Sequence, residues 1–229
     1  MPKVFDEDMV TLFSKQLFSG VIEGYGSNLV GIDYDTPDAK MLLHLQKNVY
    51  QFSAAKNWHQ MKALTEALIG DDNKVRSYSQ FKKAAYQIND TQVNAWLKTE
   101  YNTAIAGGQM AAKWVDIQAN KDTLPLLEFD AVIDGRTSDL CHSFNKIILP
   151  VTDSFWKTNY PPNHFSCRSS VRQLSSGKAT NKRDIVYPEK LPAMFQVNLA
   201  EQGLAFPPKH PYWDGVPKSF IKPANNLIK

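Results

Sequence analysis

The amino-acid sequence predicts an α+β fold: a helical N-terminal half, a small β-containing and loop-rich module, and an extended C-terminal tail. Three observations lead to this prediction. Apolar residues recur at helical spacing through the first half of the chain. Short β-forming runs separated by turn residues begin at about residue 121. Seven of the thirteen prolines then fall between Pro188 and Pro223, and proline disfavours helices and central strands.

The composition is that of a globular chain. With 43% hydrophobic and 11% aromatic residues among 229, the sequence can form a substantial core. The net charge of +3 is too small to indicate a nucleic-acid or membrane partner. No apolar run approaches the roughly 18 residues of a membrane span, and we expect no secretion signal. Two cysteines do not make a secreted disulfide scaffold, so we expect synthesis in a reducing cytoplasm.

Four parts of the chain follow from these patterns. They are an N-terminal arm at 1–35, a helical region at 36–120, the module at 121–176 and the proline-rich tail at 177–229. In the arm, residues 5–19 fit a short amphipathic helix. Gly20, Gly24, Gly26 and Gly31 should then break regularity and leave a mobile or extended connection. The tail is expected either to run extended over another surface or to stay partly ordered. In the first case its candidate anchors are Phe195, Leu199, Phe206, Tyr212 and Trp213.

The helical region has a clear start. Thr36 can cap a helix, Pro37 fits its first position, and the apolar stripe that follows indicates one helix or a helix pair. A second helical block runs from about residue 79 to 120. Within it, the pair Gly107-Gly108 should kink the helix or allow another helix to pack closely. Glu100 is interpreted as a surface carboxylate, with a buried carboxylate as the less favoured alternative.

The module should alternate strands with one helical turn. Strands are expected within residues 126–133, 146–149 and 165–174. Ser138 can cap a single turn at 139–144. Asn145 would then take the left-handed conformation at its end.

Reactive side chains gather between Asp134 and Ser170. Cys141, His142, His164 and Cys167 supply four ligands of the types that zinc prefers. The directly adjacent residues Cys141 and His142 are, however, an unfavourable pair of ligands for one ion. Three alternatives remain open: a zinc site, a disulfide between Cys141 and Cys167 formed after synthesis, and a buried network of thiols and histidines.

Catalytic signals are weaker than structural ones. Glycine-rich phosphate loops and zinc-deaminase motifs are absent from the sequence. His142, Asn159 or Asn163, and His164 match a His–Asn–His nuclease pattern poorly. We therefore expect no enzyme and assign no catalytic residue. A metal-dependent nuclease or toxin-like enzyme, using the same cysteines and histidines, is the alternative.

The remaining polar and rigid residues suit a structural role. Asp134 paired with Arg136 or Arg168 can tie irregular loops, because a guanidinium offers a planar fork of donors. Pro161 and Pro162 should stiffen the approach to His164, and either bond before a proline can be cis. Phe155 and Trp156 provide an apolar lid.

The order of these elements resembles a known signature. Read in sequence, it is Asp134-Gly135-Arg136-Thr137-Ser138, Cys141, Phe155-Trp156, Pro161-Pro162-Asn163-His164-Phe165 and Cys167-Arg168. It resembles that of the phage Mu F-like minor head proteins, the head morphogenesis proteins of tailed phages and prophages. Residues 96–104 also resemble the helix that precedes it. The chain departs at Asn145, where glycine is usual, and at Ser169, where a second cysteine often follows.

The resemblance implies a viral capsid assembly role. It implies a minor capsid protein of the virion that associates with the portal or the major capsid protein, in the capsid interior, after synthesis in the host cytoplasm. In some relatives such a protein is ejected with the DNA. DNA is a further candidate partner, because Lys and Arg outnumber Asp and Glu by eight to four from residue 177 onward.

Overall fold

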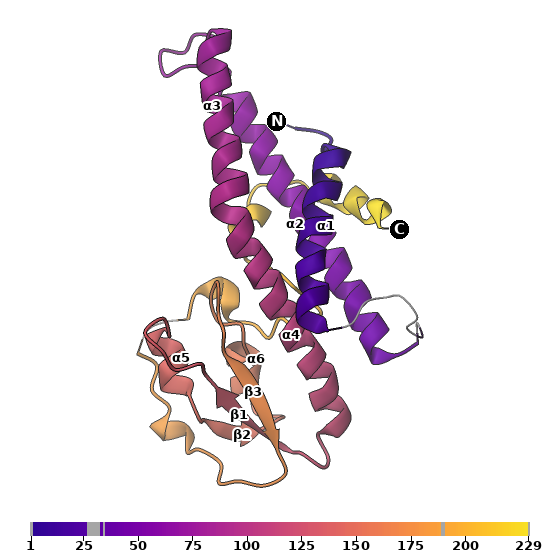
Figure 1. Ribbon diagram of the computed structural model, residues 1–229, viewed down its shortest axis with the longest axis vertical. Coiled ribbons are helices and arrows are strands. Elements are labelled where there is room, and N and C mark those ends of the chain that lie inside the picture. Colours follow the sequence, from indigo (N-terminus) through magenta and orange to yellow (C-terminus); the bar gives the residue numbers. More distant parts are fainter. Residues whose placement is uncertain (1, 27–32, 34, 189–190, 229) are drawn as a thin grey trace.

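The predicted α+β class is confirmed. The computed structural model describes residues 2–26, 33, 35–188 and 191–228. Long helices fill one end of the molecule, and a small three-stranded sheet with short helices lies beside the end of the last long helix (Figure 1). Among the described residues, no helix is long and apolar enough to cross a membrane.

The first helix, α1 (Glu7–Tyr25), is longer than predicted. Asp6 caps it by accepting a 3.0 Å hydrogen bond from the Met9 amide, and Gly26 ends it with a φ of 78°. Gly20 and Gly24 lie inside the helix, so the prediction that they break regularity is wrong. Gly31 lies outside the described residues.

Gly20 and Gly24 allow α1 to pack closely on α4 (Leu97–Asn120). A Cβ at Gly24 would lie 1.9 Å from the carbonyl oxygen of Ile105, and one at Gly108 would lie 2.2 Å from that of Val21. Both positions therefore require glycine, because any side chain would force the two backbones apart. Of the two predictions for Gly107-Gly108, close helix packing is the one confirmed.

The helix start at Thr36 is confirmed. The Thr36 hydroxyl accepts a 3.2 Å hydrogen bond from the Ala39 amide, and one unbroken helix follows, α2 (Pro37–Glu66). The second block contains α3 (Tyr78–Asp90), the π-helical segment Thr91–Trp96, and α4. These three segments form one long helix antiparallel to α2, and the connecting hairpin projects beyond the rest of the chain (Figure 1).

A buried ion pair joins α2 to α4. Lys56 Nζ lies 2.5 Å from Glu100 Oε2 and donates to the Gln92 carbonyl at 3.0 Å, and its side chain is fully buried. Tyr212 in the tail donates to the other Glu100 oxygen at 2.9 Å. The interpretation of Glu100 as a surface carboxylate is therefore wrong, since a partner 44 positions away buries it.

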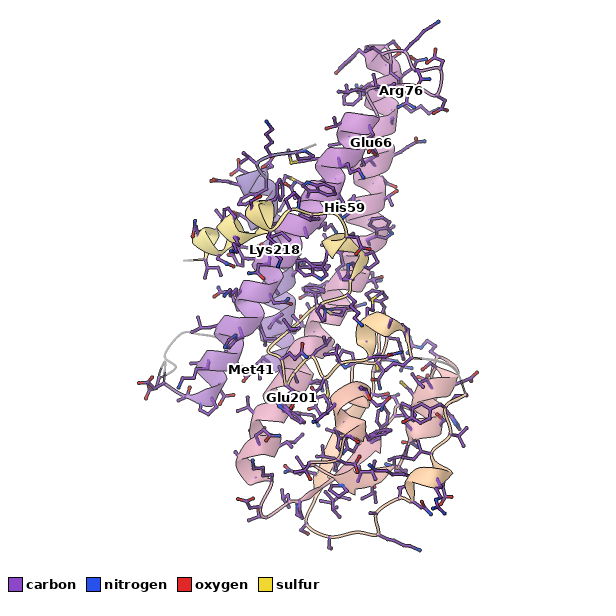
Figure 2. The ribbon with its side chains drawn as sticks, turned by 180° about the vertical axis from the view of Figure 1, so that it is seen from behind. Met41, His59, Glu66, Arg76, Glu201 and Lys218 are labelled. Atoms are coloured by element: carbon purple, nitrogen blue, oxygen red, sulfur yellow. The ribbon has the colours of Figure 1, made fainter. Side chains whose placement is uncertain are left out.

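The tail packs along α2 instead of remaining partly ordered. Figure 2 shows it passing from Glu201 up the helix, past His59, to Lys218. Asn48 Oδ1 accepts from the amides of Ala205 and Phe206 at 3.0 and 2.8 Å. Four of the five predicted anchors are buried and the fifth is partly buried; they are Phe195, Leu199, Phe206, Tyr212 and Trp213. The tail also forms short helical turns, including α7 (Lys218–Ile221), which its prolines did not predict.

The module forms an antiparallel sheet of order β2-β1-β3. Its strands are β1 (Leu126–Asp130), β2 (Ile148–Pro150) and β3 (Ser170–Leu174). Leu127 faces Leu149 across one ladder, and Phe129 faces Val171 across the other. Two short helices complete it, α5 (Asp139–Phe144) and α6 (Phe155–Asn159). The three predicted strands are present, each shorter than its predicted range.

Candidate functional site: a Cys–His cluster beside a cleft

A self-closed loop follows β1. The Asp134 amide donates to Thr137 Oγ1 at 2.9 Å, and the Arg136 amide donates to Asp134 Oδ1 at 2.8 Å. The Thr137 hydroxyl in turn donates to the carbonyl of Val132. These local bonds fix the direction of the Asp134 carboxylate, which explains why small and polar residues occupy this turn.

The Asp134 carboxylate is held by Arg168. Nη1 and Nη2 of the guanidinium donate to Oδ2 and Oδ1 at 2.8 and 2.6 Å. This hydrogen-bonded fork, and then the Arg136 amide, hold the pKa of Asp134 well below its ordinary value. The Arg136 guanidinium is 80% exposed and lies 3.8 Å from the carboxylate. Arg168 is therefore the partner that ties the two loops together.

Trp156 in α6 and the residues that directly follow this helix are buried. Trp156 is 1% exposed and donates from Nε1 to the Pro150 carbonyl at 3.0 Å. The peptide bond between Pro161 and Pro162 is cis, and it is one of the two bonds for which the sequence left a cis form open. Both prolines are buried, and the Tyr160 hydroxyl before them donates to the Met110 carbonyl of α4 at 2.9 Å. The approach to His164 is thus anchored to the helical half.

Three of the four predicted metal ligands come together. Cys141 Sγ lies 3.3 Å from His164 Nε2 and 3.8 Å from Cys167 Sγ. All three ligand atoms lie within 4.8 Å of one another. Ser138 holds the group from one side, because its hydroxyl accepts from the Cys141 amide at 3.2 Å and lies 3.1 Å from His164 Nε2. The cysteines are not joined by a disulfide in this structure.

His142 does not join this group. It is exposed on α5, while the neighbouring Cys141 is buried. Successive residues of a helix point about 100° apart, so one turn cannot direct both side chains to the same centre. The four-ligand hypothesis therefore reduces to Cys141, His164 and Cys167.

The two thiols differ in acidity. The hydrogen bond from Cys141, with further hydrogen bonds from Asn163 and Ser169, lowers the pKa of Cys167 to about 6 despite its burial. The same pairing with Cys167, together with burial, raises the pKa of Cys141 to about 12. Ser169 is among the groups whose hydrogen bonds lower the pKa of Cys167.

The prediction for Asn145 is wrong. Its φ and ψ are −56° and 130°, and the left-handed residue is Lys146, with a φ of 66°. Asn145 instead uses its side-chain oxygen to accept from the Ala131 amide at 3.1 Å. Lys146 reaches Glu128 and Asp130 at 3.0 and 2.8 Å. The left-handed residue is therefore one position later in the chain than predicted.

A cleft of about 880 Å³ opens beside the cluster. One wall is α4, through Asn102, Ile105, Ala106 and Gln109, and the other is formed by residues 135–138 and 164–168. None of the described residues lining it is an Asp or a Glu. Arg136, hydroxyl groups and side-chain amides present donors to the cleft, while Ile105, Ala106 and Phe165 give its lining an apolar part.

The α4 wall was missed by sequence reasoning. Asn102 and Gln109 are about two helical turns apart. They line the cleft opposite residues that lie at least 26 positions later in the chain. Periodicity indicates which face of α4 lies away from the core, but it does not indicate what lies opposite. The polar character of these two positions was the available signal.

Comparisons with known proteins find a family and relatives that match part of the chain. Residues 59–172 match the family described as "Phage Mu protein F like protein". Over 82 residues, the chain is 33% identical to "Putative capsid assembly protein F" of Escherichia phage Mu, covering 36% of this chain and 19% of the relative. Over 79 residues, it is 33% identical to "Mu-like prophage FluMu F protein" of Haemophilus influenzae, covering 34% and 19%. The chain thus spans about a fifth of the length of these curated relatives. No solved structure matches it.

Proposed function

The chain belongs, through residues 59–172, to the family of Phage Mu protein F like proteins, and on that premise we propose that it is a structural component of a phage or prophage head. Its role is in head morphogenesis. The observation that carries this proposal is the match of residues 59–172 to the family, together with the 82-residue match to a capsid-assembly relative. The finer parts of the proposal are association with the portal or the major capsid protein, a place inside the shell, and ejection with the DNA.

The projecting α2–α3 hairpin supports a partner surface of this kind. Val75 and Tyr78 at its tip are 76% and 77% exposed, and Tyr86 further along α3 is 65% exposed. No residue of α3 is buried. Figure 2 shows Glu66 and Arg76 at this end, remote from the module. Exposed apolar side chains on a projecting element are typical of a surface that another protein covers.

Complementation tests the proposal. A phage or prophage lacking the gene should make defective or fewer heads, and the full chain supplied in trans should restore them. A chain carrying both Val75→Asp and Tyr78→Asp should fold but fail to restore heads or to co-purify with portal or capsid protein. Lys83→Ala, on the same hairpin, is the matched control and should restore them. Normal heads without the gene would reject the proposal.

Metal-dependent hydrolysis is the second candidate, because the Cys–His cluster borders a cleft of substrate size. Against it, no carboxylate among the described cleft-lining residues is available as a general base. A nuclease assay of the purified chain with added metal separates the candidates. Activity that disappears in both Cys141→Ser and His164→Ala would favour the enzyme. Steeply salt-dependent DNA binding would instead assign a packaging role to the basic tail.

A further inference from the structure

The cluster of Cys141, His164 and Cys167 has the geometry of a metal centre. We propose that these three side chains bind one Zn²⁺ ion, with a water molecule as the fourth ligand. This inference is independent of the role in the head, because it concerns the isolated chain and is measured on it.

Two of the three distances between the ligand atoms fit a tetrahedral ion, and the third lies within 4.8 Å. Two thiolates bound to one tetrahedral zinc at about 2.3 Å lie about 3.8 Å apart, and the two sulfur atoms here are 3.8 Å apart. A thiolate and an imidazole nitrogen on the same ion lie about 3.6 Å apart, and Cys141 Sγ lies 3.3 Å from His164 Nε2. A disulfide requires about 2.05 Å between the sulfurs. The spacing therefore matches a shared ion and not a direct bond.

The outer contacts of His164 orient it as a ligand. Its Nδ1 lies 2.9 Å from the Phe165 carbonyl, which can only accept, so Nδ1 carries the proton in this bond. In the neutral ring Nε2 then has the lone pair, and Nε2 is the atom beside Cys141. A zinc-bound histidine commonly has its other nitrogen held by a carbonyl in this way.

The fourth position has room for water. A cavity of about 10 Å³ borders Cys141 and His164 and is also lined by Ser138, Ser166 and Ser169. That volume is about one water molecule by the same measure, and the three hydroxyl groups can hydrogen-bond to it. Because binding converts two thiols to thiolates, the loaded centre is neutral overall and releases protons to solvent. The adjacent Asp134–Arg168 pair adds no net charge, and the positive side chain of Arg136, which also lines this cavity, is 80% exposed to solvent.

Metal analysis of the full chain, purified without chelator, tests the site. The wild-type chain should contain about one zinc per molecule, and Cys141→Ser, Cys167→Ser and His164→Ala should lose stoichiometric zinc. His142→Ala is the matched control, because this exposed neighbour lies outside the cluster, and it should retain the metal. A wild-type chain without zinc that also fails to bind added Zn²⁺ would overturn the proposal. So would equal zinc loss in His142→Ala and His164→Ala.

Cobalt substitution covers the case in which a variant does not fold. The wild-type chain, stripped of metal and reloaded with Co²⁺, should show thiolate-to-cobalt charge transfer and the intense visible bands of a tetrahedral site. Added imidazole should shift those bands, because it replaces the water. Unshifted bands would contradict the water ligand. The contrary result is a wild-type chain that is recovered with a Cys141–Cys167 disulfide and binds Co²⁺ only weakly even after reduction. That result would contradict the metal site.

Discussion

The helical half and the module are each organised around buried or half-buried polar groups, but the groups are assembled differently. Lys56, Glu100 and Tyr212 meet from two helices and the tail, across more than 150 positions of sequence. Asp134, Arg168 and the Cys–His cluster meet within 35 positions. A compact motif can be recognised in a sequence, whereas a contact between distant elements leaves no local pattern. The comparison explains why the Asp134 pairing of the module was predicted and the Lys56–Glu100 pair of the helical half was not.

The two regions also differ in solvent access. The side chains of Lys56 and Glu100 are 0% and 6% exposed, while those of Arg168 and Asp134 are both 36% exposed. Water screens the second pair and leaves the first almost unscreened. Global stability should therefore depend on the helical pair, and local order of the loops should depend on the module pair.

Breaking the buried pair should have the largest effect. Glu100→Gln leaves the Lys56 charge buried without a counter-charge, and we expect a loss of about 3–5 kcal/mol in the free energy of unfolding. Denaturant unfolding measures it. Glu66→Gln, at an exposed helical pair with a 3.8 Å separation, is the control and should change little. A loss for Glu100→Gln no larger than that of the control would mean that the pair is not the centre of the helical half.

Disrupting the close packing of α1 on α4 should give the next largest loss of stability. In Gly108→Ala the new methyl group meets the Val21 carbonyl 2.2 Å away, so the two helices must separate. We expect a loss of about 3 kcal/mol in unfolding free energy. Gly177→Ala meets nothing closer than 3.6 Å and should lie within about 0.5 kcal/mol of the wild type. Equal stability of the two variants would show that the helices tolerate a wider spacing.

Acid should weaken the attachment of the tail. Burial, with Lys56 and His59 nearby, lowers the pKa of His210 to about 4, against an opposing effect of Asp214. The unfolded chain takes up this proton below about pH 6.5, so stability is lost as pH falls from there towards 4. At pH 5 the loss from His210 is about 2 kcal/mol.

Substitution at His210 isolates that effect. His210→Asn keeps an acceptor for the Tyr212 amide, which His210 Nδ1 accepts at 3.1 Å, and removes the titration. Its unfolding free energy should fall less between pH 7 and pH 5 than that of the wild type. Parallel pH profiles of the two proteins would contradict the assignment to His210.

The exposed pair of the module should give the smallest global effect. Asp134→Asn breaks the fork to Arg168, and we expect faster amide hydrogen exchange in residues 132–138 with no change in the unfolding midpoint. Asp71→Asn, at a fully exposed side chain in the α2–α3 hairpin, should leave that exchange unchanged. A shifted midpoint for Asp134→Asn would mean that the loops contribute to global stability after all.

Elements that depend on neighbouring residues were predicted correctly from the sequence. Thr36, Ser138 and the β-forming runs each act through neighbours a few positions away, and the structure confirms the elements that they predict. The order of residues from Asp134 to Arg168 likewise indicated the family that the comparisons show.

The failures arise where a distant partner decides. Gly24 indicates a chain break by itself, but Ile105 opposite makes it a packing position. Glu100 looks solvated until Lys56 is placed beside it. At Asn145, the bond to Ala131 overrides a general preference for left-handed backbone. Each of these depends on a contact across 14 or more positions.

The most direct measurement is the composition of purified heads. Quantitative mass spectrometry of heads made by the phage or prophage that encodes this chain should detect its peptides, from both the helical half and the module, at a reproducible copy number. Heads formed in the presence of the Val75→Asp, Tyr78→Asp chain should lack them, and heads formed with Lys83→Ala should keep them. Absence of the wild-type chain from assembling and completed heads alike would contradict the proposed role.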